Sequence, residues 1–351
     1  MTPNPDYTAV PSRELAELLD GVRRNIAAEA AELRLPKLAQ IVLGGGYGRG
    51  EGGVRRTPEG DKLYNDLDFF VFSDRAGKRE RRVIEDALKP ISRRWEEKLG
   101  IAVDFSPVKN LASLNKVGST LMFQELRRGW KPVWGDAKFE THFPELDAAQ
   151  LPASEAVRLL LNRGMGLVFA GEAIRKNGDP DFIMRNLHKS VLGGGDALLL
   201  VSGKYRWRGA ERVEAFREYA AELGLSADFA ACYADAFRYK LEPDPRLPDD
   251  PPGMWRRCRR LYLEAARRVA RCSDGAAPET VASGLRAAVK KERSFKNFLR
   301  WMRRRGGYRP LGEAFDLPLA TVACGVYRLL SGSGDAPDCP PELRRRWELF
   351  N

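Results

Sequence analysis

The spacing of apolar residues changes along the chain and predicts a mixed N-terminal part followed by helices. Apolar residues recur at intervals of three and four over residues 12–34 and again between Ser73 and Gly100, so we expect two amphipathic helices there. Beyond residue 150 the helical spacing continues, apart from a Pro- and Asp-rich stretch over Glu242–Gly253 that predicts a long loop or linker. The expected parts are an α/β (α+β) catalytic domain with a mixed sheet, a helical domain that flanks its cleft, and a helical C-terminal region, at residues 1–150, 151–243 and 254–351.

Three short apolar runs in the first domain predict strands. Leu38–Leu43 leads into a series of glycines, and Asp66–Phe72 begins with two acids. Because side chains in a strand point alternately to two faces, Asp66 and Asp68 are expected to share one face. The third run is apolar apart from Asp104, and an acid among core residues needs a partner. We therefore expect Asp104 to serve a metal ion or a hydrogen bond.

The glycine series between the first two strands admits several nucleotide-binding interpretations. Gly48, Gly50 and Gly53 match the dinucleotide-binding pattern G-x-G-x-x-G literally. The following segment, Val54–Asn65, contains a proline, a glycine and five charges, so it is not expected to form the helix that this motif opens. A P-loop is excluded because no Lys-Ser/Thr pair closes the turn. The remaining interpretation is a glycine turn whose backbone N–H groups, with the paired acids, hold a polyphosphate and its divalent ions.

These motifs resemble the signature of the polymerase-beta-like nucleotidyltransferases. In that family a hydrophobic residue and a small-residue pair end the first strand, Asp-x-Asp lies on the next, and a third carboxylate lies on a later strand. The corresponding residues here are Leu43–Gly46, Asp66, Asp68 and Asp104. The stretch GGYGRGE is similar to bacterial members, including uridylyltransferases that modify regulatory proteins, and Glu125–Asp136 resembles the segment that closes many of their catalytic domains. The resemblance covers about residues 38–136.

The resemblance implies transfer of a nucleoside monophosphate from a nucleoside triphosphate (NTP) to a hydroxyl acceptor, with release of pyrophosphate. Two divalent ions, Mg²⁺ or alternatively Mn²⁺, would be held by Asp66, Asp68 and Asp104. The backbone amides of Gly45 and Gly46 would bind the β- and γ-phosphates. ATP is the default expectation for the NTP, and a small molecule, a protein and RNA stay open as acceptors. The alternative is a non-catalytic module that binds nucleotide or RNA in the same cleft.

Two cations are further candidates for nucleotide binding. Arg49 follows the glycine turn, where its planar guanidinium could pair with phosphate oxygens or form a salt bridge to Glu51. Lys189 lies on a predicted helix of the second region, where similar enzymes carry a lysine that reaches the triphosphate; a solvated surface lysine is the alternative. Tyr205 could face the base, although a packing tyrosine is the stronger expectation. His188 is expected to be structural.

One departure from the family concerns chain length. Nineteen residues separate Gly46 from Asp66, more than the family usually has, so we expect a loop insertion there that either binds substrate or is decorative. A second departure is Asn65, which stands where serine is commonest in the family.

The charge of the chain is concentrated near its C-terminus. The formal net charge is +11, and Gly253–Asn351 alone contains 21 Lys and Arg against 10 Asp and Glu, so this region holds the whole excess. Part of it is the cationic stretch KKERSFKNFLRWMRRR at residues 290–305. A basic region predicts an anionic partner such as nucleic acid, and solvated arginines on packed helices are the alternative.

The rest of the composition excludes several classes of protein. No apolar run approaches the roughly 18 residues of a membrane helix, and the N-terminus lacks the basic-then-apolar order of a secretory signal, so we expect a cytoplasmic protein with no membrane partner. The five cysteines include no C-x-x-C pair, and with two histidines they offer no zinc site of recognisable spacing. Reduced thiols are expected.

Overall fold

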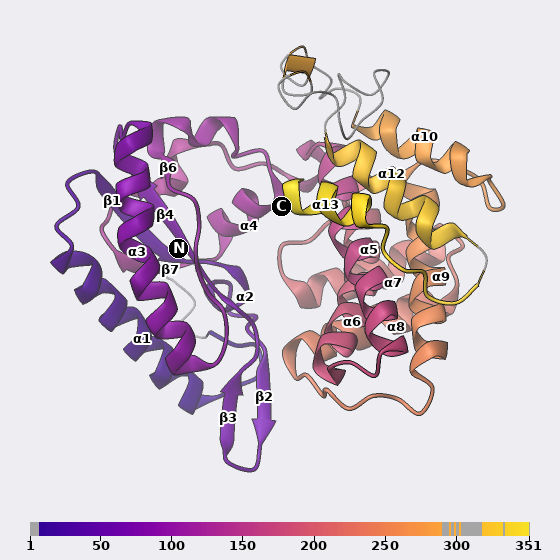
Figure 1. The fold of residues 1–351 in the computed structure, drawn as a ribbon, viewed down its shortest axis with the longest axis horizontal. Coiled ribbons are helices and arrows are strands. Elements are labelled where there is room, and N and C mark those ends of the chain that lie inside the picture. Colours follow the sequence, from indigo (N-terminus) through magenta and orange to yellow (C-terminus); the bar gives the residue numbers. More distant parts are fainter. Residues whose placement is uncertain are drawn as a thin grey trace. The chain divides into compact units, whose positions relative to one another are not determined.

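The computed structural model describes residues 7–289, 295, 298, 299, 302, 318–332 and 334–350. Their contacts divide the chain into two units. The first unit is the N-terminal part up to Leu146 together with Arg238–Asp244, and the second is Asp147–Phe237 together with the chain from Pro245 onward. The helices expected at residues 151–243 and 254–351 therefore pack within one unit, coloured pink to yellow in Figure 1.

A mixed sheet forms the centre of the first unit. Its strands are β1 (Leu38–Leu43), β4 (Leu67–Ser73), β5 (Val103–Phe105), β6 (Lys109–Asn110) and β7 (Lys131–Trp134). The order is β5-β4-β1-β7, and β6 also pairs with β4. β1 is antiparallel to β4 and β7, whereas β4 is parallel to β5 and β6. The expected mixed α/β class is confirmed, and the nucleotidyltransferase fold stays a prediction.

The alternation of side chains along β4 explains why both faces of the sheet are buried. Leu67, Phe69 and Val71 pack in one core cluster with α1 (Arg13–Glu32) and α3 (Lys78–Leu99), the two long helices beside the sheet in Figure 1. Phe70 and Phe72 point to the other face, where they pack with α4 (Leu121–Arg128) and the 3-10 helices η1 (Leu111–Lys116) and η2 (Phe139–His142). The apolar core thus fixes β4, and with it the acids at its beginning.

The expected N-terminal helix is present and begins with a side-chain cap. Ser12 precedes α1, and its hydroxyl accepts a hydrogen bond from the Leu15 N–H (3.3 Å). Two residues that carry the helical spacing nevertheless face solvent, since Leu18 is 38% exposed and Val83 is 59% exposed. The spacing therefore identified the helices, but fewer of their apolar residues are buried than the spacing predicts.

The nineteen-residue insertion is not a loop. Its centre is a hairpin of β2 (Val54–Thr57) and β3 (Gly60–Leu63), paired antiparallel with Thr57 opposite Gly60. Gly60 has φ +120°, a conformation that side chains disfavour, so the glycine that argued against a helix closes the hairpin turn. The expectation of a loop was wrong because the charged residues lie on exposed or partly buried positions of these short strands, while Val54 and Leu63 are buried.

The second unit is helical. It contains α5 (Ala153–Arg175), α6 (Pro180–Val201), α7 (Gly209–Glu222), most of α8 (Ala227–Leu241), α9 (Pro251–Val269), α10 (Pro278–Ala288), α12 (Pro318–Ser331) and α13 (Pro341–Phe350), besides the short 3-10 helix η3 (Ala148–Gln150). Helices α5, α6 and α9 pack against one another, and α12 packs on α5. None of the described helices combines the length and the apolar character needed to cross a bilayer.

Helix α6 continues through three consecutive glycines, Gly193 to Gly195. A Cβ on Gly193 would lie 2.2 Å from Arg163 Cγ, and one on Gly195 would lie 2.3 Å from the Tyr233 ring. Gly194 has roomier surroundings. Gly193 and Gly195 therefore make room for side chains of neighbouring helices.

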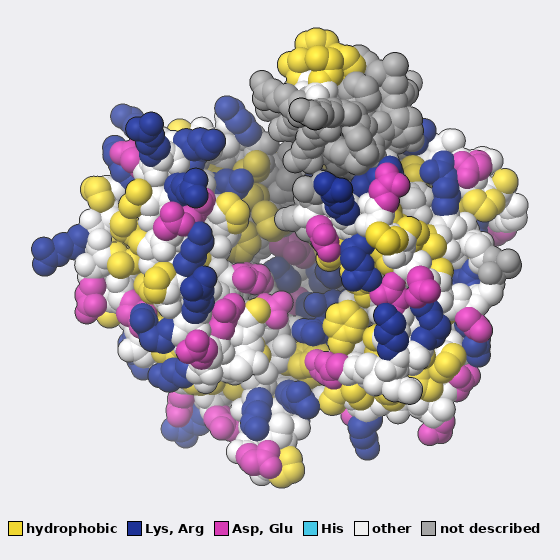
Figure 2. All heavy atoms as spheres, in the orientation of Figure 1, with side chains coloured by type: hydrophobic (Ala, Val, Ile, Leu, Met, Phe, Trp, Pro, Cys, Tyr) yellow, Lys and Arg dark blue, Asp and Glu magenta, His cyan; other side chains and the backbone are white. Residues whose placement is uncertain are grey.

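Many arginines of the basic C-terminal region are paired within their own unit. Acidic side chains lie among the cationic ones over the visible helices of this unit (Figure 2). The ion pairs include Arg257 and Arg260 with Asp228, Arg328 with Glu279, and Arg344 with Glu172. Most of the stretch 290–305 lies outside the described residues. In the described part, these contacts support the interpretation as packed helical faces.

Candidate active site

β1 ends at a glycine turn that is fastened to β4. Gly44 donates its N–H to the backbone oxygen of Asp68 (2.8 Å), and the one-turn helix α2 (Gly45–Gly48) follows. A Cβ on Gly44 would lie 2.6 Å from the Phe70 ring, so the position has no room for a side chain. The turn and the start of β4 therefore form one rigid piece.

The carboxylate of Asp68 lies directly against the backbone of Gly45. A Cβ built on Gly45 would stand 2.1 Å from Asp68 Oδ2, far inside van der Waals contact. Gly45 also has φ +60°, which L side chains rarely adopt. Gly46 is less confined, because its Cβ would lie 3.4 Å from the Glu51 carbonyl oxygen, about van der Waals contact. Glycine at position 45 is thus required twice over, by its backbone conformation and by the carboxylate.

The third predicted acid joins the first two through the sheet. Asp104 is the register partner of Asp68 on the adjacent parallel strand, so their side chains emerge on the same face. Burial raises the pKa of Asp104, and the negative charges of Asp66 and Glu96 raise it further. The structure therefore brings Asp66, Asp68 and Asp104 into one neighbourhood, with Asp104 more exposed than the other two.

Glu96 is an acid of this neighbourhood that sequence reasoning missed. It lies near the end of α3, and its carboxylate accepts a hydrogen bond from the Val103 N–H (3.3 Å), which ties α3 to the start of β5. In the sequence it is one of two consecutive glutamates of an amphipathic helix, and nothing there distinguishes it. Its effect on Asp104 depends on a strand that follows seven residues later.

The acids suit the predicted divalent ions by donor type. Among the residues that the structure describes, no three His, Cys, Asp or Glu side chains already form a metal-binding group. Carboxylate oxygens are nevertheless the donors that Mg²⁺ and Mn²⁺ prefer, and a divalent ion relieves the kind of repulsion that raises the pKa of Asp104. The residues therefore fit the predicted ions, whose binding stays a prediction.

Tyr47 fixes the chain on both sides of the insertion and was not singled out from the sequence. Its side chain is fully buried, and its hydroxyl donates to the Gly53 carbonyl oxygen (2.8 Å) and accepts from the Tyr64 N–H (2.9 Å). Burial raises the pKa of Tyr47 to about 12. Asn65 adds a second link by accepting the Gly53 N–H (2.6 Å). These hydrogen bonds close the base of the hairpin immediately before Asp66. In the sequence, the only available sign of this role was a tyrosine within a series of glycines.

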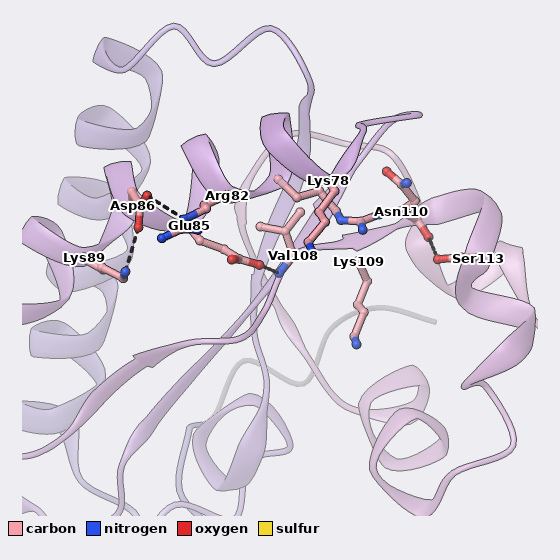
Figure 3. A pocket seen from close by; sticks show the side chains of 10 residues that line it. Lys78, Arg82, Glu85, Asp86, Lys89, Val108, Lys109, Asn110 and Ser113 are labelled. Atoms are coloured by element: carbon pink, nitrogen blue, oxygen red, sulfur yellow. Dashed lines mark hydrogen bonds and ion pairs between the residues drawn. The ribbon is translucent and has the colours of Figure 1, made fainter. Parts of the chain in front are cut away.

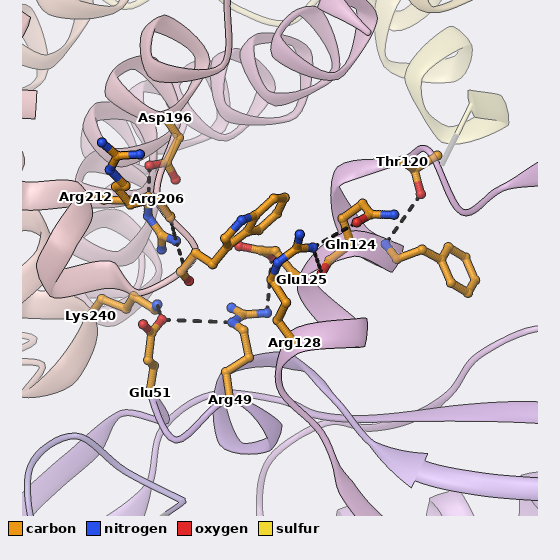
Figure 4. A network of polar contacts seen from close by, with 12 residues as sticks. Arg49, Glu51, Thr120, Gln124, Glu125, Arg128, Asp196, Arg206, Arg212 and Lys240 are labelled. Atoms are coloured by element: carbon orange, nitrogen blue, oxygen red, sulfur yellow. Dashed lines mark hydrogen bonds and ion pairs between the residues drawn. The ribbon is translucent and has the colours of Figure 1, made fainter. Parts of the chain in front are cut away.

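Arg49 belongs to a partly buried network of charges (Figure 4). Its Nη1 atom lies 3.2 Å from Glu125 Oε2, and its Nε atom lies 4.0 Å from Glu51 Oε2. Lys240 also pairs with Glu51 (2.9 Å), and Gly129 leaves room for the Arg49 stem because a Cβ there would lie 2.6 Å from Arg49 Cγ. The salt bridge to Glu51 that the sequence left open is present, weaker than the pair with Glu125. A phosphate contact of Arg49 stays a prediction.

The remaining sequence-derived candidates lie in the second unit. Lys189 is a half-buried residue of α6, so it is not part of the acid and glycine cluster that the first unit builds by itself. Its neighbour His188 is also half-buried, and desolvation by this burial lowers the pKa of His188 to about 4, as a neutral structural histidine requires. Tyr205 is only 2% exposed and packs against Trp207 and Arg212, which supports the packing interpretation.

Comparison with known proteins adds no relative to this picture. No family model matches the chain, and neither a curated protein nor a solved structure matches it significantly. The nucleotidyltransferase resemblance therefore rests on the motif residues and on the geometry around Gly45 and Asp68.

Proposed function

We propose that the protein is a metal-dependent nucleotidyltransferase that moves a nucleoside monophosphate from an NTP to a hydroxyl acceptor. The observation that carries the proposal is the Asp68 carboxylate packed on the Gly45 backbone, with Asp104 beside it on the next strand. The backbone proposed to bind phosphate thus lies directly beside the carboxylates proposed to bind metal ions. This is the combination that transfer at a phosphorus atom needs, since positioning and charge stabilisation supply most of its catalysis.

The glycine turn supplies the phosphate end of the site. The backbone N–H groups of Gly45 and Gly46 would donate to the β- and γ-phosphates, because the absence of side chains lets a phosphate approach the backbone. Arg49 would neutralise the departing pyrophosphate by exchanging its ion pair with Glu125 for phosphate oxygens. Lys189 stays a proposed contact to the triphosphate from the helical unit.

The acids supply the metal and proton end. Asp66, Asp68 and Asp104 would hold Mg²⁺ or Mn²⁺, which when bound would polarise the phosphates and lower the pKa of the acceptor hydroxyl. Asp104 is the most exposed of the three acids, so its carboxylate would be the one to accept the acceptor proton.

The experiment that tests this function needs no knowledge of the acceptor. The purified chain is incubated with each of the four α-labelled NTPs, Mg²⁺ and a cell extract, and the products are separated into small-molecule, protein and RNA fractions. We expect label in one fraction, with ATP as the first NTP to try. The Asp66→Ala, Asp68→Ala double variant should lose the label.

A matched control excludes a general effect of removing an acid. Asp74→Ala removes an exposed carboxylate just beyond β4, so this variant should label the same acceptor as the wild type. Labelling that survives the double substitution contradicts the site assignment. NTP binding without any transfer would instead support the non-catalytic module.

A further inference from the structure

A pocket on the first unit lies along the edge of the sheet, between α3 and the chain after β5 (Figure 3). Its volume is about 580 Å³, within the roughly 300–1,000 Å³ of typical small-molecule sites. Lys109, at its edge, pairs with Phe72, four residues beyond Asp68 on β4, which is roughly 13 Å along the strand at about 3.3 Å per residue. The hollow is therefore separate from the acid cluster.

Cations dominate the lining of this pocket. Five cationic side chains face two acids, and α3 contributes all but one of the seven. The cations are Lys78, Arg81, Arg82, Lys89 and Lys109. The acids are Glu85 and Asp86.

Both acids of the pocket are already occupied. Glu85 accepts a hydrogen bond from the Val108 N–H (3.0 Å), which attaches the chain after β5 to α3. Asp86 lies 2.7 Å from Lys89 and 3.8 Å from Arg82, and Figure 3 shows it between these two cations. The negative charges of the two acids can therefore neutralise at most two of the five cations, Lys89 and Arg82.

Three cations are left over. Lys78, Arg81 and Lys109 form no ion pair with any residue that the structure describes, although Arg81 donates to the Ala76 carbonyl oxygen (3.5 Å). In Figure 3 the Lys109 side chain extends away from the ion pairs at Asp86. Like charges gathered in one pocket repel one another. A bound anion is attracted to each of these cations and offsets their mutual repulsion.

The floor of the pocket is rigid. The Asn110 side-chain oxygen accepts from the buried Ser73 hydroxyl (2.7 Å) and the Ala76 N–H (2.8 Å), and its NH₂ group donates to the Ala76 carbonyl oxygen (2.9 Å). Ser113 donates to the Asn110 carbonyl oxygen (2.8 Å). The backbones that carry the cations are therefore held before a ligand arrives, which lowers the entropic cost of binding.

We propose that this pocket binds a nucleotide-sized ligand that carries two or more phosphate groups. Three cations on two elements suit several separated negative charges better than a single carboxylate. Arg81 can pair with two oxygens of one phosphate, while the lysines act as point charges on others. The proposal does not depend on the proposed transfer reaction, because it needs only the anion chemistry of the ligand.

The test uses the full chain and inorganic triphosphate as the probe, titrated by calorimetry in EDTA so that no divalent ion assists the glycine turn. We expect binding by the wild type. The Lys78→Gln, Lys109→Gln variant should bind at least roughly tenfold more weakly, since each substitution removes a charge-assisted contact. The matched control, Lys62→Gln with Lys98→Gln, removes two lysines outside the pocket and should keep wild-type affinity.

Three results would overturn the proposal. They are no triphosphate binding by the wild type, an equal loss in the matched control, and an unchanged affinity in the pocket variant. A parallel titration with a short single-stranded RNA separates two sources of phosphate. RNA binding that is lost in the pocket variant, without triphosphate binding, contradicts the nucleotide-sized ligand and assigns the cations to a nucleic-acid backbone.

Discussion

The backbone of Gly45 and the carboxylate of Asp68 are in such close contact that a methyl group at position 45 would stand 2.1 Å from Asp68 Oδ2. This contact joins the turn proposed to hold phosphates to an acid proposed to hold metal ions. A change at Gly45 is therefore expected to act on both functions together.

Gly45→Ala tests this relationship, and Gly100→Ala is its matched control. Both glycines have positive φ, +60° and +68°, but a Cβ on Gly100 would meet nothing within 4 Å. Each alanine should destabilise the fold by about 1 kcal/mol through backbone strain. Only Gly45→Ala should also displace Asp68 and abolish transfer of label. Denaturant unfolding and the labelling assay measure the two effects; equal activity of the two variants would contradict the proposed role of the contact.

Tyr47→Phe should destabilise the first unit without changing its shape. The substitution leaves the buried Gly53 carbonyl and Tyr64 N–H without their hydroxyl partner, at a cost of about 1–3 kcal/mol. Urea unfolding measures the loss. Tyr219→Phe, which removes a hydroxyl with no hydrogen bond to a described residue, should change stability by less than about 0.5 kcal/mol. A similar small effect at Tyr47 would contradict the hydrogen bonds described here.

Asp104→Asn should stabilise the protein at neutral pH in the absence of metal. The folded state raises the pKa of Asp104, so folding disfavours its ionised form, and the wild type loses stability as the pH rises through that pKa. The amide has no charge to bury or repel. The advantage of the variant over the wild type should therefore shrink as the pH falls from the raised pKa of Asp104 to the ordinary pKa of an aspartate, as thermal unfolding at several pH values would show. A variant less stable at pH 7 would contradict this account.

In the presence of Mg²⁺ the wild type should become more stable than Asp104→Asn. An ion held by Asp66, Asp68 and Asp104 binds the folded state only, so it should raise the melting temperature of the wild type with increasing concentration. Asp104→Asn should gain less, and Asp74→Ala should gain as much as the wild type. The same melting temperature with Mg²⁺ and with EDTA would argue against a metal site at these acids.

His188 should contribute to acid unfolding. Burial lowers its pKa to about 4, so its stabilising effect is present above the ordinary histidine pKa of about 6.5 and is lost as the pH falls from there towards 4. His188→Gln should flatten the stability curve in this window, whereas the same substitution at exposed His142 should leave the slope in place. Unfolding in urea between pH 7 and pH 4 measures both, and an unchanged slope in His188→Gln would contradict the buried neutral imidazole.

The sequence predicted the elements whose signals are local. β1 and β4 are mostly apolar, and the residues of α1 have helical spacing, so each could be recognised from its own residues. Asp104 lies beside Asp68 because both belong to the same sheet, whereas Asp66 directly precedes β4, so its expected place on the strand face of Asp68 stays a prediction.

Features that depend on distant parts of the chain could not be predicted. The end of α8 belongs to the first unit, where Tyr239 hydrogen-bonds Tyr64 (3.0 Å) and Lys240 pairs with Glu51, and no local pattern announces a contact across 175 residues. The ion pair of Arg49 with Glu125 and the influence of Glu96 on Asp104 also depend on how separate elements pack together. The sequence predicts a chemistry for the turn, whereas packing decides which charges surround the turn.

The central claim is transfer of a nucleoside monophosphate, and the position of the label tests it most directly. Parallel reactions with α-labelled and γ-labelled ATP, Mg²⁺ and extract distinguish nucleotidyl transfer from phosphoryl transfer. We expect the acceptor to carry label only from α-labelled ATP, with the γ-label recovered as pyrophosphate, and we expect both products to disappear in the Asp66→Ala, Asp68→Ala variant. Acceptor labelled from the γ-position, or transfer that persists in this variant, would contradict the account.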